Sequence, residues 1–228
     1  MSSSVKPWKL HSLNYHKMNT KLNQYLSGGA PIASAKGVLI MIHGRGSASS
    51  DIMELSGELL IEGMAVIAPQ APQNSWYPHS FMAPNVSNQP EIDFSLKIID
   101  ELVQKILSYG ISHEKIFFLG FSQGACLMLE YISRNARKYG GAIAFTGGLI
   151  GETLVSDKYH GDFSGTRVLI TTGDSDPHVP LARVKESATQ LETQRAIVRL
   201  ELYPGKSHSI LFEEIDIANN WIFNHPRI

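Results

Sequence analysis

Short apolar runs alternate with segments of helical periodicity from Gly37 onwards, and this alternation leaves few folds open to the chain. Six of the runs predict strands, at residues 37–42, 64–68, 115–120, 141–145, 167–172 and 197–203. Most of them are continuously apolar, which is typical of parallel strands buried on both faces. The sequence therefore predicts an α/β fold with a mostly parallel central sheet and helices on both faces.

The segments between these runs predict the helices. One helix contains an apolar stripe with steps of four and three residues, made of Ile92, Leu96, Ile99, Val103 and Ile106. The other predicted helices are residues 50–62, 123–138, 181–194 and 209–223. The stretch from Lys21 to Leu26 predicts an antiparallel edge strand, and we expect residues 1–20 to form a flexible or peripheral N-terminal segment.

Charge and cysteine content narrow the range of partners. The 228 residues include 20 Lys and Arg against 21 Asp and Glu, without the concentrated basic surface that nucleic acid or an anionic membrane requires. We therefore expect a small-molecule partner, no nucleic acid and no stable membrane insertion. The only cysteine is Cys126, so no disulfide can form within the chain, and we expect a cytoplasmic protein.

Ser122 lies at the seam between a predicted strand and a predicted helix, flanked by Gly120 and Gly124 in the pattern GxSxG. In a strand–turn–helix setting this pattern is typical of a nucleophile elbow, in which glycines permit a turn sharp enough to expose the serine. The serine would also lie at a helix N-terminus, where negative charge is favoured. The alternative is an ordinary N-cap serine after a glycine turn.

A serine nucleophile needs a histidine base and a carboxylate that orients the histidine. Asp174 and Asp176 follow the predicted strand 167–172, and His208 follows the strand 197–203. This is the order Ser, acid, His that the elbow architecture requires. Each residue alone could have an ordinary role, a turn or cap for the aspartates and a solvated position for the histidine. The spacing leaves the choice between the two aspartates open.

Backbone N–H groups must stabilise the oxyanion that forms during acyl transfer. One expected donor is the N–H of Gln123, directly after the serine. The other is the N–H of Arg45 in the loop HGRG, where glycines let the backbone approach a ligand. A phosphate-binding role for this loop is disfavoured because the Lys-Ser/Thr pair and the GxGxxG spacing are absent. We expect His43 to be structural.

The motifs HGRG, APQAP, GFSQGA, GDSDPHVP and GKSHSI, in this order, resemble the phospholipase/carboxylesterase family of α/β-hydrolases, which includes the acyl-protein thioesterases. The resemblance runs from about Lys36 to the C-terminus. It implies one α/β-hydrolase domain over residues 1–228. It further implies Ser122 as nucleophile, Asp176 as acid and His208 as base, with Arg45 and Gln123 as oxyanion donors.

Two positions depart from the thioesterase branch of this family. Ala125 follows GFSQG where a glycine is usual, and Ser47 follows HGRG where an acidic residue is usual. The segment 74–94 also differs. The chain looks more like the bacterial carboxylesterase branch.

The substrate pocket is expected near the loop 71–90. About twenty residues separate the strands 141–145 and 167–172, which leaves no room for a large lid domain. Candidate wall residues are apolar or aromatic, although each could equally serve ordinary packing: Trp76, Tyr77, Phe81, Met82 and Leu149. We expect no metal and no other cofactor, because neither His79 nor His178 lies in a cluster with metal-ligand spacing.

The sequence therefore predicts a serine hydrolase that cleaves carboxylic esters or thioesters of small to medium acyl groups through an acyl-enzyme. One alternative is a catalytically silent α/β-hydrolase domain that binds a ligand or acts in signalling. Another is a dienelactone-type hydrolase, although a cysteine in place of Ser122 would favour that chemistry. The protein could also form a homodimer, and the sequence leaves this question open.

Overall fold

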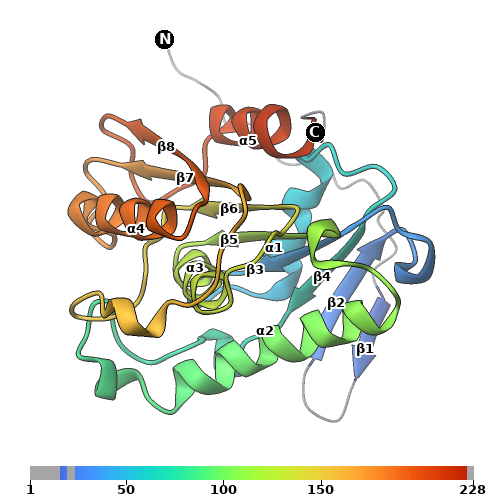
Figure 1. Ribbon diagram of the computed structural model, residues 1–228, viewed down its shortest axis with the longest axis horizontal. Coiled ribbons are helices and arrows are strands. Elements are labelled where there is room, and N and C mark those ends of the chain that lie inside the picture. The colour runs from blue at the N-terminus through green and yellow to red at the C-terminus, as the bar shows by residue number, and fades with distance from the viewer. Residues whose placement is uncertain (1–15, 20–23, 225–228) are drawn as a thin grey trace.

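The computed structural model describes residues 16–19 and 24–224, and within them an eight-stranded sheet lies between two layers of helices (Figure 1). The strand order is β1-β2-β4-β3-β5-β6-β7-β8. The strands are β1 His16–Asn19, β2 Gln24–Gly29, β3 Val38–Ile42, β4 Ala65–Pro69, β5 Ile116–Phe121, β6 Gly141–Phe145, β7 Arg167–Gly173 and β8 Ile197–Tyr203. Neighbours from β4 to β8 are parallel, and β2 is antiparallel to β1 and β4. The predicted α/β fold with a mostly parallel sheet is confirmed.

Helices cover both faces of this sheet. They are α1 Ser49–Glu54, α2 Glu91–Ser108, α3 Gln123–Arg134, α4 Leu181–Thr193 and α5 Phe212–Ala218. Val38, Ile40 and Ile42 of β3 belong to one hydrophobic cluster, with α2, α3 and α4. Leu39 and Met41 belong to the opposite cluster, with α1 and α5. This alternation follows from the period of two along a strand, and it explains why β3 is apolar at every position.

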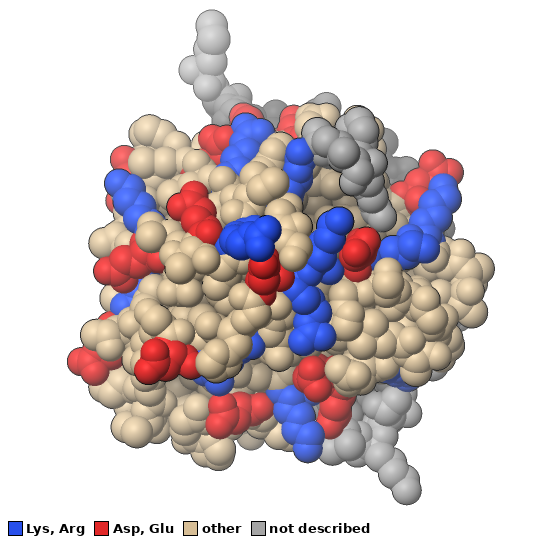
Figure 2. All heavy atoms as spheres, viewed as in Figure 1, with Lys and Arg blue, Asp and Glu red and all other residues tan. Residues whose placement is uncertain are grey.

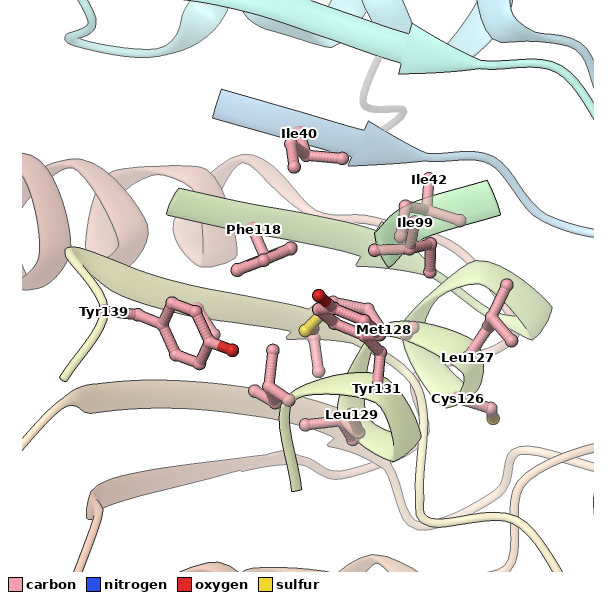
Figure 3. Packing of buried hydrophobic residues seen from close by; sticks show 14 of the residues in the cluster. Ile40, Ile42, Ile99, Phe118, Cys126, Leu127, Met128, Leu129, Tyr131 and Tyr139 are labelled. Atoms are coloured by element: carbon pink, nitrogen blue, oxygen red, sulfur yellow. The ribbon is translucent and has the colours of Figure 1, made fainter. Parts of the chain in front are cut away.

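The helix that follows Ser122 is buried almost all round. Figure 3 shows Leu127, Met128 and Tyr131 of α3 among the side chains of the cluster that also contains Ile40 and Phe118 of the sheet. Because α2 packs over the outer side of α3, almost none of the α3 side chains is exposed to solvent. The helix that carries the elbow is therefore fixed in the core.

Tertiary contacts end two helices earlier than the sequence predicts. The predicted helix 50–62 is α1 followed by the short 3₁₀ turn Leu55–Glu58. Its end is held by Asn219, whose side chain accepts a hydrogen bond from Leu60 N (2.7 Å) and donates one to Glu58 O (2.8 Å). The predicted helix 123–138 stops at Arg134, because Ala136 forms backbone hydrogen bonds with residues 160 and 162.

The last predicted helix, 209–223, begins later, at Phe212, and its final turn Asn219–Phe223 is a π-helix. The first positions of the prediction belong instead to the loop that carries His208. Near the N-terminus, the predicted edge strand overlaps β2, which is antiparallel as expected but lies inside the sheet, between β1 and β4. The rest of that prediction, positions 21–23, lies outside the described residues, as do residues 1–15 of the N-terminal segment.

No lid domain covers the expected active site around Ser122 in the described part of the chain. The connection from β6 to β7, residues 146–166, contains only the 3₁₀ turn Ser156–Lys158. None of the helices within residues 24–224 is long and apolar enough to cross a membrane. Figure 2 shows acidic and basic side chains interspersed over the face in view, consistent with the net charge of −1.

Candidate active site

Ser122 lies in a sharp turn between β5 and α3. Its backbone has φ 54° and ψ −119°, a conformation that costs energy in any residue with a side chain. The turn is possible because its neighbours are glycines. A Cβ atom on Gly120 would lie 2.6 Å from Gly124 O, and one on Gly124 would lie 2.1 Å from Ile42 O. The GxSxG pattern thus reflects close contact of the backbones of β3, β5 and α3.

A chain of hydrogen bonds connects the three residues of the expected triad. Ser122 Oγ lies 2.7 Å from His208 Nε2, and His208 Nδ1 lies 2.7 Å from Asp176 Oδ2. The other carboxylate oxygen of Asp176 accepts the N–H groups of His178 (2.8 Å) and Val179 (3.0 Å). The fold thus brings together residues separated by 54 and 32 positions, at the carboxyl ends of β5, β7 and β8.

The Asp176 side chain is fully shielded from solvent. Burial by itself would raise the pKa of this carboxyl, but the hydrogen bond to His208, followed by the two backbone N–H groups, outweighs it and lowers the pKa. The group is therefore ionised at neutral pH and can fix the imidazole with Nδ1 protonated. Nε2 is then left as the acceptor for the serine proton.

Asp174 has a different environment. Its Oδ1 accepts the backbone N–H of Gly205 (2.7 Å) and the hydroxyl of Ser175 (2.9 Å), and these bonds lower the pKa of its carboxyl. It lies on the surface and connects the loop after β7 to the loop after β8. Its geometry is that of a residue that shapes the loop.

The expected oxyanion donors lie beside the nucleophile. A Cβ atom on Gly44 would lie 3.5 Å from Ser122 Cβ, so the HGRG loop passes directly over the serine. Among the described residues, the Arg45 N–H donates no hydrogen bond, while the next N–H, that of Gly46, donates to Asn74 O. Gln123 is the first residue of α3, where N–H groups have no partner within the helix. Both N–H groups are thus available to a ligand.

The side chains of Arg45 and Gln123 have a second role that sequence reasoning missed. Gln123 Oε1 accepts Trp76 N (3.0 Å), and Gln123 Nε2 donates to Tyr77 O (2.8 Å). The Arg45 guanidinium donates to Pro78 O (2.7 Å) and to the carbonyl of residue 79 (2.6 Å). The segment 75–80 is therefore tied to the two elements that carry the oxyanion donors. In the sequence, the glutamine directly after the serine was the only signal that could have indicated these contacts.

His43 is held as a neutral structural residue, as expected. Its Nδ1 donates to Gly44 O (2.7 Å), and its Nε2 accepts the N–H of Ala71 (3.1 Å). Burial lowers the pKa of this imidazole and keeps it uncharged. His43 thereby joins the HGRG loop to the start of the segment 71–90.

A cleft of about 400 Å³ opens beside Ser122. Its walls come from five parts of the chain, namely the HGRG loop, the segment 77–81, the start of α3, the loop that carries Asp176 and the loop that carries His208. The residues that line it are Arg45, Tyr77, Pro78, His79, Ser80, Phe81, Ser122, Gln123, Cys126, His178, Val179 and His208. Two of the five expected wall residues, Tyr77 and Phe81, are among them.

The structure does not place Trp76, Met82 or Leu149 in the wall of the cleft. Trp76 is buried and its indole Nε1 donates to His43 O (2.8 Å), so it supports the HGRG loop from beneath. Leu149 is fully buried in the core. Met82 is half-buried against the same core cluster. These three expectations are corrected, because apolar character alone did not distinguish a residue under the loop from one facing the cleft.

Sequence reasoning also missed a buried ion pair next to the loop that carries His208. Lys206, two residues before His208, forms a buried ion pair with Glu214 of α5. Nothing in the local sequence pattern marked either residue.

Cys126 is buried in the core, as expected, and it also lines the cleft. Within residues 16–19 and 24–224, His, Cys, Asp and Glu side chains form no group of three or more that could hold a metal ion.

Comparison with known proteins identifies the family of this chain. A model of the Phospholipase/Carboxylesterase family matches residues 28–225. The crystal structure of a phospholipase/carboxylesterase from Dyadobacter fermentans DSM 18053 is 52% identical in sequence, with a TM-score of 0.87, and the match covers 91% of this chain and 99% of that one.

More distant relatives have related names. A probable carboxylesterase SOBER1-like from Arabidopsis thaliana is 24% identical over 206 residues, which cover 82% of this chain and 78% of the relative. An acyl-protein thioesterase 1 from Saccharomyces cerevisiae is 24% identical over 214 residues, which cover 85% of this chain and 94% of the relative. Because the family model spans most of the chain and the fold is that of the α/β-hydrolases, this protein belongs to the phospholipase/carboxylesterase family.

Proposed function

We propose that this protein hydrolyses carboxylic esters or thioesters of small to medium acyl groups, with Ser122 as nucleophile, His208 as general base and acid, and Asp176 as the group that orients the histidine. The observation that carries the proposal is the unbroken hydrogen-bond chain from Asp176 through His208 to Ser122, both links 2.7 Å long. The serine hydroxyl opens into a cleft large enough for a small ester.

The reaction proceeds in two halves. In the first, Ser122 Oγ attacks the substrate carbonyl carbon while His208 Nε2 takes its proton, and the backbone N–H groups of Arg45 and Gln123 stabilise the oxyanion. Collapse of the tetrahedral intermediate expels the alcohol or thiol, which receives the proton from His208, and leaves an acyl-serine. In the second, His208 takes a proton from water as the water oxygen attacks the acyl-serine carbonyl. Collapse of this second tetrahedral intermediate releases the acid, and His208 returns the proton to Ser122 Oγ.

Two alternatives are less well supported. A catalytically silent binding domain would not need the strained Ser122 turn or an aligned base, and both are present. A dienelactone-type hydrolase would be favoured by a thiol at the elbow, whereas here Cys126 is buried one helical turn beyond Ser122, and burial raises the pKa of its thiol to about 12. The cysteine is therefore a neutral thiol at physiological pH.

The test is covalent labelling combined with a substrate panel. A fluorophosphonate probe is expected to label the wild type, and Ser122→Ala should abolish the label; persistence of the label in that variant would remove Ser122 as the nucleophile. A series of p-nitrophenyl esters of increasing acyl length, beside matching acyl-thioesters, then gives chain-length preference and the preferred leaving group. Cytoplasmic location and a homodimer stay predictions, for which cell fractionation and light scattering are the measurements.

A further inference from the structure

The hydroxyl of Tyr77 is a buried polar group with no nitrogen or oxygen hydrogen-bond partner among residues 16–19 and 24–224. Only 2% of the residue is exposed. Burial raises its pKa well above the usual range for a phenol, so the group stays protonated and can donate a hydrogen bond. The thiol of Cys126 is a weak partner for this hydroxyl, because sulfur is a poor hydrogen-bond acceptor. Leaving such a hydroxyl unsatisfied costs about 1–3 kcal/mol.

The position of Tyr77 is fixed on several sides. Its carbonyl accepts hydrogen bonds from Gln123 Nε2 (2.8 Å) and Ser75 Oγ (2.9 Å). The Arg45 guanidinium lies 5.8 Å from the centre of its ring. Two of these three side chains, those of Gln123 and Arg45, belong to the residues expected to supply the oxyanion donors. The hydroxyl is therefore preorganised relative to the reacting serine.

Tyr77 lines the same cleft as Ser122. The lining of this cleft also includes Phe81, Cys126 and Val179, whose side chains offer no strong hydrogen-bond acceptor. A purely alkyl substrate chain in this cleft would leave the phenol hydroxyl without a partner. A chain that carries an oxygen atom at the right position would satisfy it.

We propose that Tyr77 is a specificity-determining residue whose hydroxyl donates a hydrogen bond to an oxygen atom on the substrate chain. The enzyme then prefers esters or thioesters whose acyl or alcohol chain carries an ether, hydroxyl or carbonyl oxygen over alkyl chains of the same length. The physical basis is that a site built to hydrogen-bond a polar substrate group is penalised when that group is absent. This inference rests on the proposed hydrolase function.

The experiment compares substrates that differ by one atom. In the acyl series, p-nitrophenyl butyrate is paired with p-nitrophenyl methoxyacetate, and p-nitrophenyl hexanoate with its isosteres in which oxygen replaces, in turn, each chain methylene beyond the one bonded to the carbonyl. In the alcohol series, pentyl butyrate is paired with its oxygen-substituted isosteres. Each kcat/KM is expressed as wild type over Tyr77→Phe, so the intrinsic reactivity of each ester cancels. The series that responds identifies which side of the ester occupies the cleft.

Tyr77→Phe is expected to lower kcat/KM for at least one oxygen-containing ester by about tenfold while changing its alkyl partner less than twofold. The matched control is Tyr203→Phe, which removes another buried phenol hydroxyl without a partner, one that lies away from the cleft. In that control the ratios should stay at one. Thermal melting establishes that both variants fold.

Two results would overturn the inference: an equal loss for oxygen-containing and alkyl esters, or no change for either. An equal loss would mean that the hydroxyl supports the fold of the cleft and recognises no substrate atom. The proposed function fails separately, if the wild type hydrolyses none of the esters or if Ser122→Ala retains activity. A hydrolase that depends on Ser122 but responds equally to both members of every pair would refute the role of Tyr77 alone.

Discussion

Lys206 and Glu214 form an ion pair shielded from solvent on both sides, with the Lys206 side chain 1% exposed and the Glu214 side chain 0% exposed. The pair lies between the loop that carries His208 and the first turn of α5. Glu214 also accepts the hydroxyl of Thr171 in β7 and the backbone N–H of Leu211. The lysine donates further to Thr146 Oγ1 at the end of β6. The His208 loop is thus anchored to three parts of the fold.

Breaking this pair should cost far more than breaking an exposed one. Lys206→Met leaves a carboxylate buried without its cation, and we expect a loss of about 3–5 kcal/mol in the free energy of unfolding. The double variant with Glu214→Gln should recover part of that loss, because no charge remains buried. Urea denaturation measures both. The control is Lys97→Met in the exposed Lys97–Glu101 pair of α2, where the expected loss is below about 0.5 kcal/mol. An equal effect of the two lysine substitutions would refute the anchoring role.

Gly124 should not tolerate even one methyl group. A Cβ atom there would lie 2.1 Å from Ile42 O, a backbone atom of a central strand that cannot move aside. Gly124→Ala is therefore expected to abolish activity and to lower the melting temperature by several degrees, as measured by circular dichroism. Gly57→Ala is the matched control, because nothing lies within 4 Å of its added Cβ. Wild-type activity in Gly124→Ala would mean that the elbow is less tightly packed than described.

The two aspartates after β7 should differ sharply in kinetics. Asp176→Asn removes the carboxylate that holds the imidazole, and a loss in kcat of roughly a thousandfold or more is expected. Asp174→Asn disturbs only the hydrogen bonds to Gly205 and Ser175, and it should lower kcat less than about tenfold. Steady-state kinetics with one p-nitrophenyl ester compares them. The reverse ranking would transfer the role of the acid to Asp174.

Asp176 should also make stability depend on pH at the acid end. The pKa of its carboxyl is lowered in the folded protein, so the stabilisation is fully present above the unfolded value of about 3.9 and is lost as pH falls through the folded value. The difference in unfolding free energy between wild type and Asp176→Asn should therefore shrink below about pH 4. Urea titrations at several pH values measure it, with the exposed Asp157→Asn as a control for net charge. A difference that stays constant down to pH 3 would contradict the assignment.

Predictions from the sequence succeed where the signal is local. Continuous apolar runs give all six predicted strands to within one residue at each end, because burial on both faces leaves a pattern within the strand itself. Two of them, 64–68 and 115–120, shift by one residue, to Ala65–Pro69 and Ile116–Phe121. Helix ends are less accurate. The end of the turn after α1 depends on Asn219, which lies about 160 positions away.

The fold class and the order serine, acid, histidine were predicted by the sequence alone, because strand periodicity and strand-end position are local properties of the chain. The choice of Asp176 over Asp174 came from the family resemblance and not from the spacing. Only the tertiary structure decided which aromatic residues face the cleft. Trp76 and Tyr77 are adjacent and both buried, yet one supports the HGRG loop and the other lines the cleft. The partners of Lys206 and Gln123 likewise become visible only after folding. A buried polar group pairs with a group that lies near it in the folded protein, and the spacing of residues along the sequence does not indicate which group that is.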